Sequence, residues 1–385
     1  MIPYGRQDIT QDDLDAVRDV LTSDFLTQGP RVPEFEATVA KTTGAAHAVA
    51  ANSATSALHI ACMALGLGPD DWLWTVPNTF VASANVGIYC GARVDFVDID
   101  PDSFNMCPDA LAAKLERAEV AGTLPKVLIP VHMTGQSADM ERIGALAKLY
   151  GVRVIEDASH AIGASFAGQP VGCCVHSDIT VFSFHPVKIV TTAEGGVAVT
   201  QDEALAARMR RAASHGLTRD PALMTHDSHG PWYYQQIELG YNYRMTEMQA
   251  ALGISQLGRL ADYIARRTVH ARAYDTALAD LPLDLPRQDP RCASAWHLYV
   301  VRLRLDQIAL SHREVFEALR AAGLGVNLHY IPVHTQPFWR GFGFKDGDFP
   351  NAESYYARSI SIPLFATMTD AQREEVCAVL KATLT

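Results

Sequence analysis

One lysine in the sequence has neighbours that favour a chemical role. Lys188 closes the segment Val181–Lys188, which has the pattern of an apolar strand followed by Pro186, and the apolar pair Ile189 and Val190 comes next. Most lysines are solvated charges, but these neighbours predict a half-buried side chain. Burial disfavours the ammonium form and lowers the pKa of a lysine, which is the condition that a Schiff-base nucleophile needs. Lys188 is therefore the candidate nucleophile.

A carboxylate is predicted at the end of another strand. The segment Val154–His160 passes from apolar residues to Glu156 and Asp157, which places Asp157 at the carboxyl end of a buried strand. In a parallel sheet these ends face the ligand crevice. Asp157 would serve equally well as a cap for the turn that follows. The segment by itself leaves both interpretations open.

Small hydroxyl residues begin a predicted helix. Ser53, Ala54 and Thr55 would lie at its N-terminus, where amides and hydroxyls form a ready phosphate site. Ordinary N-capping by Ser53 explains the same segment equally well when it is taken alone. Further along, the aromatic residue Phe80 follows a predicted turn. The order along the chain is then a helix start suited to bind phosphate, the aromatic side chain of Phe80, the strand-end acid Asp157 and the strand-end lysine Lys188.

Other chemical signals are absent or weak. The sequence has no P-loop and no nucleophile elbow. His226 and His229 lie in a polar loop, but their spacing is unspecific, so we expect loop histidines and no metal site. The seven cysteines are scattered, and the adjacent Cys173 and Cys174 rarely bridge each other, so we expect reduced thiols.

Composition excludes several classes of protein. Asp and Glu number 43 against 32 Lys and Arg, and the resulting net charge of -11 argues against a nucleic-acid-binding protein. The N-terminus has no apolar signal segment, and no apolar run approaches the ~20 residues that span a bilayer. We therefore expect a soluble, cytoplasmic protein without a membrane partner. Its 385 residues predict two or three domains.

Strands interleaved with helices must position these residues. Such alternation predicts an α/β domain over residues 1–250, with a mostly parallel sheet covered on both faces. Expected strands include 94–99, 127–131, 152–155, 179–184 and 196–200.

The pattern changes after Met245. A stripe of apolar residues over 254–264 predicts one long amphipathic helix. It would link the first domain to a smaller α+β domain, and together they make up residues 251–385. A strand near His297–Arg304 and a final helix from Thr369 belong to this second part.

Taken together, the motifs resemble the DegT-type sugar aminotransferases, a family of fold-type I pyridoxal phosphate enzymes. The similarity extends from Ile2 to the C-terminal region. Within the family, "PNTFVASAN" and "FHPVK" most resemble the PseC branch, which aminates C4 of a UDP-linked 4-keto-6-deoxy sugar on the route to pseudaminic acid. The motifs that carry the resemblance are "TQGP" at 27–30, "NSATSAL" at 52–58, "EDASHA" at 156–161, "SFHPVK" at 183–188, "EGG" at 194–196 and "GYNYRMTEMQAALG" at 240–253.

The resemblance implies a role for each matched residue. Lys188 matches the lysine that binds the cofactor covalently, and Asp157 matches the acid that pairs with its ring nitrogen. His160 matches a residue near the phenolic oxygen, and Phe80 matches the aromatic residue that stacks on the ring. The implied phosphate contacts are Ser53, Ala54, Thr55, Ser183 and, from the neighbouring subunit of a homodimer, Asn242. Ala54 replaces the glycine found in much of the family, a change that the PseC branch shares.

The implied reaction moves the amino group of L-glutamate to C4 of a UDP-linked 4-keto-6-deoxy-N-acetylhexosamine. Thr27, Arg244, His329 and Tyr330 are candidate substrate contacts, although Arg244 would serve equally well in a structural ion pair. A dTDP-linked sugar or amination at C3 is the alternative. A dehydratase of the same fold is a weaker alternative, because its branch has histidine at the position of Lys188. A regulatory protein that only holds the cofactor would not need the full set of matched residues.

Overall fold

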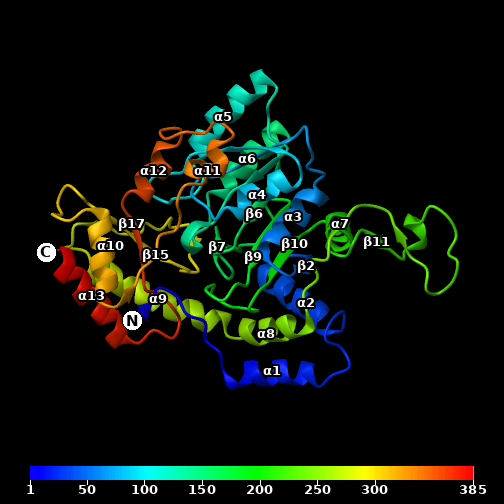
Figure 1. The fold of residues 1–385 in the computed structure, drawn as a ribbon, viewed down its shortest axis with the longest axis horizontal. Coiled ribbons are helices and arrows are strands. Elements are labelled where there is room, and N and C mark those ends of the chain that lie inside the picture. Colours follow the sequence, from blue (N-terminus) through cyan, green and yellow to red (C-terminus); the bar gives the residue numbers. More distant parts are fainter. Residues whose placement is uncertain (385) are drawn as a thin grey trace.

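A seven-stranded sheet forms the centre of the computed structural model, which describes residues 1–384 and leaves Thr385, the last residue of the expected C-terminal domain, outside (Figure 1). The strand order is β2-β10-β9-β6-β5-β3-β4. Of these seven strands, β10 (Gly196–Thr200) runs antiparallel to its neighbours and the others run parallel to one another. The expected mostly parallel, mixed sheet is therefore confirmed. The other strands are β2 (His47–Ala51), β3 (Trp72–Thr75), β4 (Arg93–Phe96), β5 (Val127–Ile129), β6 (Arg153–Asp157) and β9 (Ile179–Ser183).

Both faces of the sheet are buried. Along β10, Ala198 joins the apolar cluster that contains Leu58, whereas Val197 and Val199 join the cluster that contains Phe35. Successive side chains of a strand point to opposite faces, so the two clusters lie on the two sides of the sheet. The helices of this part are α2 (Arg31–Thr43), α3 (Ala54–Ala64), α4 (Ala82–Tyr89), α5 (Pro108–Ala121), α6 (Met140–Tyr150), α7 (Glu203–Ala213) and α8 (Glu247–Leu257).

The N-terminal helix α1 (Gln11–Leu21) lies outside these layers and packs against α8 (Figure 1). A capping box begins the helix, in which the Thr10 amide donates to Asp13 Oδ2 at 2.9 Å. Asp13 is only 1% exposed, and it also accepts from Ser255 Oγ at 2.6 Å. A buried carboxylate requires such partners, and they hold α1 in place.

The expectation of one long helix through residues 254–264 is wrong. The chain forms two helices, α8 and α9 (Leu260–Ala277), with a break at Gly258 and Arg259. Glycine is a poor helix former, and Arg259 leaves the helical conformation at φ -107° and ψ 5°. The Arg259 guanidinium contacts the buried Asp13 carboxylate at 2.6 Å, so a contact with α1 accompanies the break in the apolar stripe.

The C-terminal part has its own sheet and apolar core. Strand β15 (Tyr299–Leu303) pairs antiparallel with β13 (Leu283–Asp284) and β17 (Ser359–Ile362). The start of the chain joins this part, because β1 (Ile2–Pro3) pairs with β16 (Leu324–Gly325), and Figure 1 shows both termini on this side. Helices α9, α10 (His312–Ala321) and α13 (Asp370–Leu384) complete its layer.

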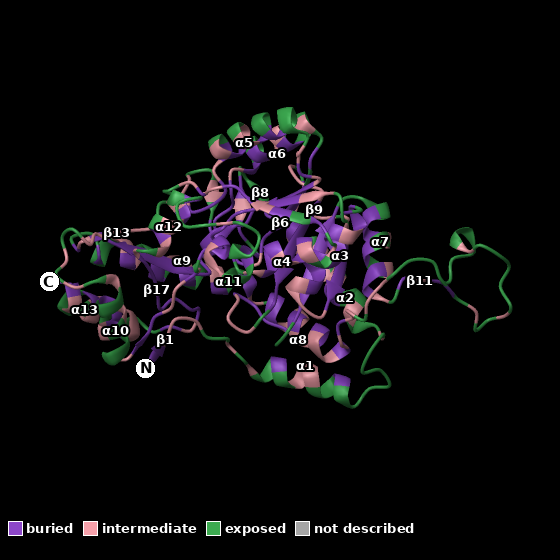
Figure 2. Ribbon diagram, turned by 45° about the horizontal axis from the view of Figure 1, so that its top comes forward, coloured by how far each residue is buried: buried purple, intermediate pink, exposed green. Residues whose placement is uncertain are grey.

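A hairpin arm, residues 217–236, projects from the opposite side of the molecule (Figure 2). It begins with β11 (Leu217–Thr218) and returns through β12 (Gln235–Gln236), and most of the residues between them are exposed. Trp232 is the most exposed large apolar side chain in the arm. Nowhere in residues 1–384 does a helix combine the length and apolarity needed to cross a membrane.

Candidate active site

A cavity of about 970 Å³ lies at the carboxyl ends of β6 and β9. Its wall combines residues of the large sheet, its helices and the C-terminal part. Among the predicted site residues, those on the wall are Ser53, Ala54, Thr55, Phe80, Asp157, His160, Ser183, Lys188, His329 and Tyr330. Segments far apart in the sequence therefore meet in one cavity at the carboxyl ends of the strands, where a ligand crevice was expected.

Lys188 follows β9 in a turn in which its amide donates to His185 O at 2.9 Å. The side chain is half-buried, as its apolar neighbours predicted. Burial lowers the pKa of Lys188 to about 8, although the attraction of the Asp157 carboxylate opposes the shift. A lysine with this pKa holds a far larger fraction of neutral amine near neutral pH than an ordinary lysine does, and the neutral amine is the nucleophilic form.

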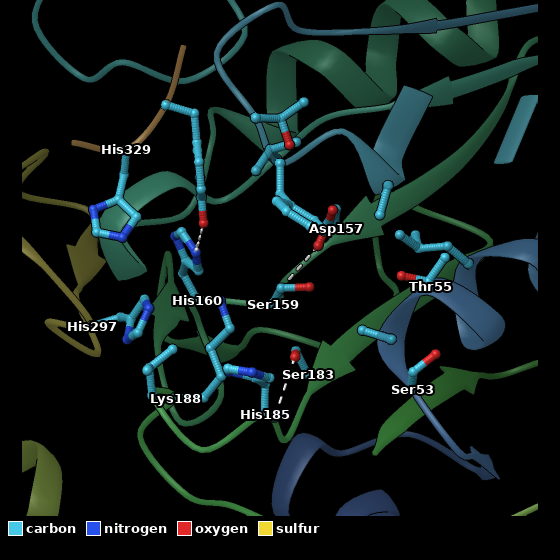
Figure 3. A pocket seen from close by; sticks show the side chains of 18 of the residues that line it. Ser53, Thr55, Asp157, Ser159, His160, Ser183, His185, Lys188, His297 and His329 are labelled. Carbon is cyan, nitrogen blue, oxygen red and sulfur yellow. Dashed lines mark hydrogen bonds between the residues drawn. The ribbon is translucent and has the colours of Figure 1, made fainter. Parts of the chain in front are cut away.

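Asp157 is the last residue of β6 and borders the cavity. Its Oδ1 accepts from the Ser159 amide at 3.1 Å, and its Oδ2 accepts from Ser83 Oγ at 2.7 Å. The bond to Ser159 is the turn cap that the sequence left open as an alternative. The two interpretations are therefore compatible, because the same carboxylate caps its turn and faces the cavity (Figure 3).

The N-terminus of α3 offers a site for an anion. Ser53 caps the helix by accepting from the Ser56 amide at 3.1 Å, so the expected N-cap is present. The amides of Ala54 and Thr55 lie in the first turn, where no helical carbonyl can accept from them, and both residues border the cavity. A Cβ on Gly196 would come within 2.5 Å of the Ala54 backbone, so only glycine lets β10 pass this close to the helix start.

His160 bridges the large sheet and the C-terminal part. The Thr134 amide donates to His160 Nδ1 at 3.3 Å, which leaves the proton on Nε2 to bond Tyr330 Oη at 3.0 Å. Burial, reinforced by repulsion from Lys188, lowers the pKa of His160 well below its ordinary value. The imidazole is therefore neutral. In Figure 3 the His160 ring lies between His329 and Asp157.

His297 is a wall residue to which the sequence analysis gave no role. Its ring centroid lies 4.4 Å from that of His160, and its side chain is 3% exposed. Burial and the neighbouring His160 and Lys188 lower the pKa of His297 well below its ordinary value. The available signal was a polar residue placed directly before the apolar run of β15.

Three predicted site residues are not among the described residues that line this cavity. Thr27 pairs with Thr246 in an isolated bridge, and Asn242 pairs with Ser214 in another. Arg244 Nη1 donates to Ser214 Oγ at 3.3 Å, and Asn242 itself is exposed. The fold thus places all three away from the cavity wall of their own chain.

His226 and His229 lie together in the hairpin arm, with ring centroids 5.6 Å apart. His226 Nε2 contacts Tyr233 Oη at 2.5 Å, and its Nδ1 contacts Gln235 Nε2 at 3.2 Å. Over residues 1–384, no three or more His, Cys, Asp or Glu side chains are grouped closely enough to hold a metal ion.

Comparison with known proteins gives a consistent identity. Residues 7–381 match the DegT/DnrJ/EryC1/StrS aminotransferase family. The spore coat polysaccharide biosynthesis protein SpsC of Bacillus subtilis is 39% identical over 383 residues, which cover 99% of this chain and 96% of SpsC.

Solved structures agree with that match. Helicobacter pylori PseC, an aminotransferase involved in the biosynthesis of pseudoaminic acid, gives a TM-score of 0.89 at 28% identity over 100% of this chain and 99% of its own. The PLP form of the putative sugar aminotransferase Spr1654 from Streptococcus pneumoniae gives a TM-score of 0.87 at 28% identity over 100% of both chains. The chain therefore belongs to the DegT/DnrJ/EryC1/StrS aminotransferase family, and it is an aminotransferase that depends on pyridoxal phosphate.

Proposed function

We propose that this aminotransferase transfers the amino group of L-glutamate to a nucleotide-linked keto-sugar. The finer proposal is C4 of a UDP-linked 4-keto-6-deoxy-N-acetylhexosamine, on the route to pseudaminic acid. The observation that carries the proposal is the meeting of Lys188, Asp157 and the N-terminus of α3 on one cavity wall. The motif likeness to the PseC branch and the likeness to PseC itself support the choice of sugar.

A second candidate substrate is another nucleotide-linked keto-sugar, either dTDP-linked or aminated at C3. The higher identity to SpsC, 39% against 28% for PseC, favours keeping this candidate. Both candidates use the same amino donor and the same cavity. They differ only in the groups that contact the sugar and its nucleotide.

The groups around the cavity match the chemistry of pyridoxal phosphate. The amides of Ala54 and Thr55 and the hydroxyl of Ser183 would hold its phosphate, and Asp157 would hold the proton of its ring nitrogen. Phe80 is 58% exposed at the cavity, where its ring is free to stack on that of the cofactor. The bound cofactor supplies an aldehyde that accepts amino groups and a ring that withdraws electrons.

Lys188 would do the proton transfers. With its pKa lowered to about 8, its Nζ would accept the proton from the amino-bearing carbon of glutamate. The same Nζ would later return a proton to the sugar carbon that receives the amino group. His160, held neutral with its proton on Nε2, would orient Tyr330 at the cavity wall.

We propose that the two parts of the chain divide these tasks. Residues 1–250 would bind the cofactor, and residues 251–385 would supply substrate contacts through His329 and Tyr330. Both side chains border the cavity from the C-terminal side, which supports this division. His329 Nδ1 bonds Ser361 Oγ at 2.8 Å, so its ring is fixed.

We further propose a homodimer in which each active site uses both chains. Among the lysines and arginines of residues 1–384, Lys188 alone lines the cavity, whereas the cofactor phosphate, glutamate and a nucleotide sugar all bring negative charge. Asn242 is exposed away from its own cavity, and so is available to a partner. Thr27 and Arg244 lie in segments that adjoin it and are the further candidate contacts.

A product assay tests the reaction. Purified enzyme with glutamate should aminate one member of a panel of UDP- and dTDP-linked keto-sugars, and the product's position identifies C3 or C4. A Lys188→Ala variant should lose turnover and the visible band of the lysine-bound cofactor. Turnover by that variant at the normal rate would contradict the proposed mechanism.

Mixed dimers test the shared site. Lys188→Ala and Asn242→Asp should each be inactive, and the Asp would set a carboxylate against the cofactor phosphate. After mild dissociation and mixing, one site of a mixed dimer carries both changes and the other carries neither, so activity should return to about half of wild type per mixed dimer. Verified mixed dimers that stay inactive, with Asn242→Asp alone clearly impaired, would show that Asn242 serves its own chain.

A further inference from the structure

Two buried hydroxyls form a chain that ends on Asp157. Thr79 Oγ1 lies 2.8 Å from Ser83 Oγ, and Ser83 Oγ lies 2.7 Å from Asp157 Oδ2. Ser83 is fully buried and Thr79 nearly so, although Thr79 borders the cavity. Seventy-four residues separate Ser83 from Asp157 in the sequence, so only the tertiary fold brings the start of α4 to the end of β6.

The carboxylate sets the direction of these hydrogen bonds. An ionised carboxylate is an acceptor only, and a hydroxyl has a single proton to donate. Ser83 therefore donates to Asp157 and must accept from Thr79. Hydrogen bonds in such a chain polarise one another, and a bond to a charged acceptor is stronger than one between neutral groups.

We propose that Ser83, supported by Thr79, is a positioning residue for Asp157, a relay of two hydroxyls that orients the carboxylate toward the cofactor's ring nitrogen. The inference rests on the role proposed above for Asp157. A carboxylate offers about four lone pairs, and the bonds from Ser83 and the Ser159 amide occupy two of them. One lone pair on each Asp157 oxygen therefore remains free to accept the proton of the cofactor's ring nitrogen.

The same segment would act on the cofactor in two ways, directly through the Phe80 ring and indirectly through Asp157. Residues 79–83 carry Phe80, the candidate stacking ring, between the two hydroxyls of the relay. The main chain is fixed here, because the Ser83 amide donates to Phe80 O at 3.3 Å and the Asn85 amide to Val81 O at 2.8 Å. A shift in the relay would therefore move the ring face and the Asp157 carboxylate together.

The test measures the affinity of the apoenzyme for pyridoxal phosphate, by equilibrium titration, in a double-mutant cycle of Ser83→Ala and Asp157→Asn. Loss of a hydrogen bond to a charged group should weaken binding by about tenfold to a hundredfold in Ser83→Ala. In the Asp157→Asn background the same change should cost less than about threefold, because the charge that Ser83 serves is gone.

Matched variants separate the relay from simple damage to the fold. Thr79→Val removes the outer hydroxyl and should weaken cofactor binding, whereas Thr79→Ser keeps the hydroxyl and should restore it. Thr75→Val is the control, since Thr75 is a buried hydroxyl that donates to Ile129 O at 2.8 Å and does not touch Asp157. It should lower the melting temperature and leave the affinity for the cofactor unchanged.

The outcomes distinguish the relay from the proposed function. Unchanged affinity in Ser83→Ala beside a weakened Asp157→Asn would overturn the relay alone. Equal losses from Ser83→Ala in both backgrounds would also overturn it, because the serine would then act independently of the charge. Unchanged affinity in Asp157→Asn would overturn the role of Asp157 and the relay with it.

Discussion

Glu156 and Asp157 are consecutive residues of β6, yet they serve opposite sides of the sheet. Both are 5% exposed, so burial does not distinguish them. Glu156 bonds His132 Nε2 at 2.6 Å through Oε2, while Oε1 accepts from Ser177 and Thr180. Asp157 has the Ser83 and Ser159 donors and, beyond them, the cavity.

The difference lies in how each charge is compensated. Burial alone would raise the pKa of Glu156, but the hydrogen bond and charge of His132, with the Ser177 and Thr180 hydroxyls, outweigh it and lower the pKa. Groups of the protein thus complete the hydrogen bonds of the Glu156 carboxylate. Asp157 keeps acceptor capacity directed at the cavity, which makes it available to a ligand. Two acids with equal burial therefore differ in whether the protein alone completes their hydrogen bonds.

The largest effect should be the loss of activity when Asp157, the acid that faces the cavity, is replaced. Asp157→Asn keeps the shape and removes the charge, and loss of one partner from a buried pair costs about 3 to 5 kcal/mol. At ~1.36 kcal/mol per tenfold, kcat/KM should fall by at least a hundredfold. The unfolding midpoint of the apoenzyme should change little. Activity within a few-fold of wild type would show that Asp157 is only a turn cap.

Substitution of Glu156, on the other side of the sheet, should lower stability and leave activity nearly unchanged. Glu156→Gln sets an amide against the Ser177 and Thr180 hydroxyls, and an unsatisfied buried group costs about 1 to 3 kcal/mol. Denaturant unfolding should detect this loss, while kcat per folded molecule stays close to wild type. If this variant instead lost turnover as severely as Asp157→Asn, the division between the two sides of the sheet would be wrong.

The contribution of Glu156 should depend on pH. Because folding lowers its pKa, the native state binds this proton less tightly than the unfolded state does. The resulting stability is present above the ordinary glutamate pKa and is lost as the pH falls through the lowered one. The difference in unfolding free energy between wild type and Glu156→Gln should therefore shrink below about pH 4. A difference that grew in acid would contradict this sign.

A smaller effect is expected for Lys188 in the apoenzyme. Folding lowers its pKa from 10.5 to about 8, so holding this amine in the native state costs stability. Lys188→Met should raise the free energy of unfolding by about 1 to 3 kcal/mol below pH 8. Between pH 8 and pH 10.5 the unfolded state binds more protons than the native state does. The stability advantage of Lys188→Met should therefore fade as the pH rises toward 10.5. A destabilised variant at pH 7 would count against burial as the cause.

Local patterns predicted much of the fold and the core of the candidate site. Alternating strands and helices predicted the mostly parallel sheet, and the expected strand 196–200 coincides with β10. The end of a strand predicted the position of Asp157, and small hydroxyl residues predicted the start of α3. Lys188 was expected at a strand end and instead lies in the turn that follows β9. These features depend on neighbours within a few residues, so the sequence contains them directly.

Only the tertiary structure decided which distant groups complete those features. Asp13 and Arg259, 246 residues apart, meet where the predicted long helix breaks. Ser83 reaches Asp157, and His297 joins the cavity wall although its segment showed only a strand. The fold also placed Asn242 outside its own cavity. The physical reason is that hydrogen bonds and buried charges depend on distance in space, which local sequence patterns do not specify for residues far apart in the chain.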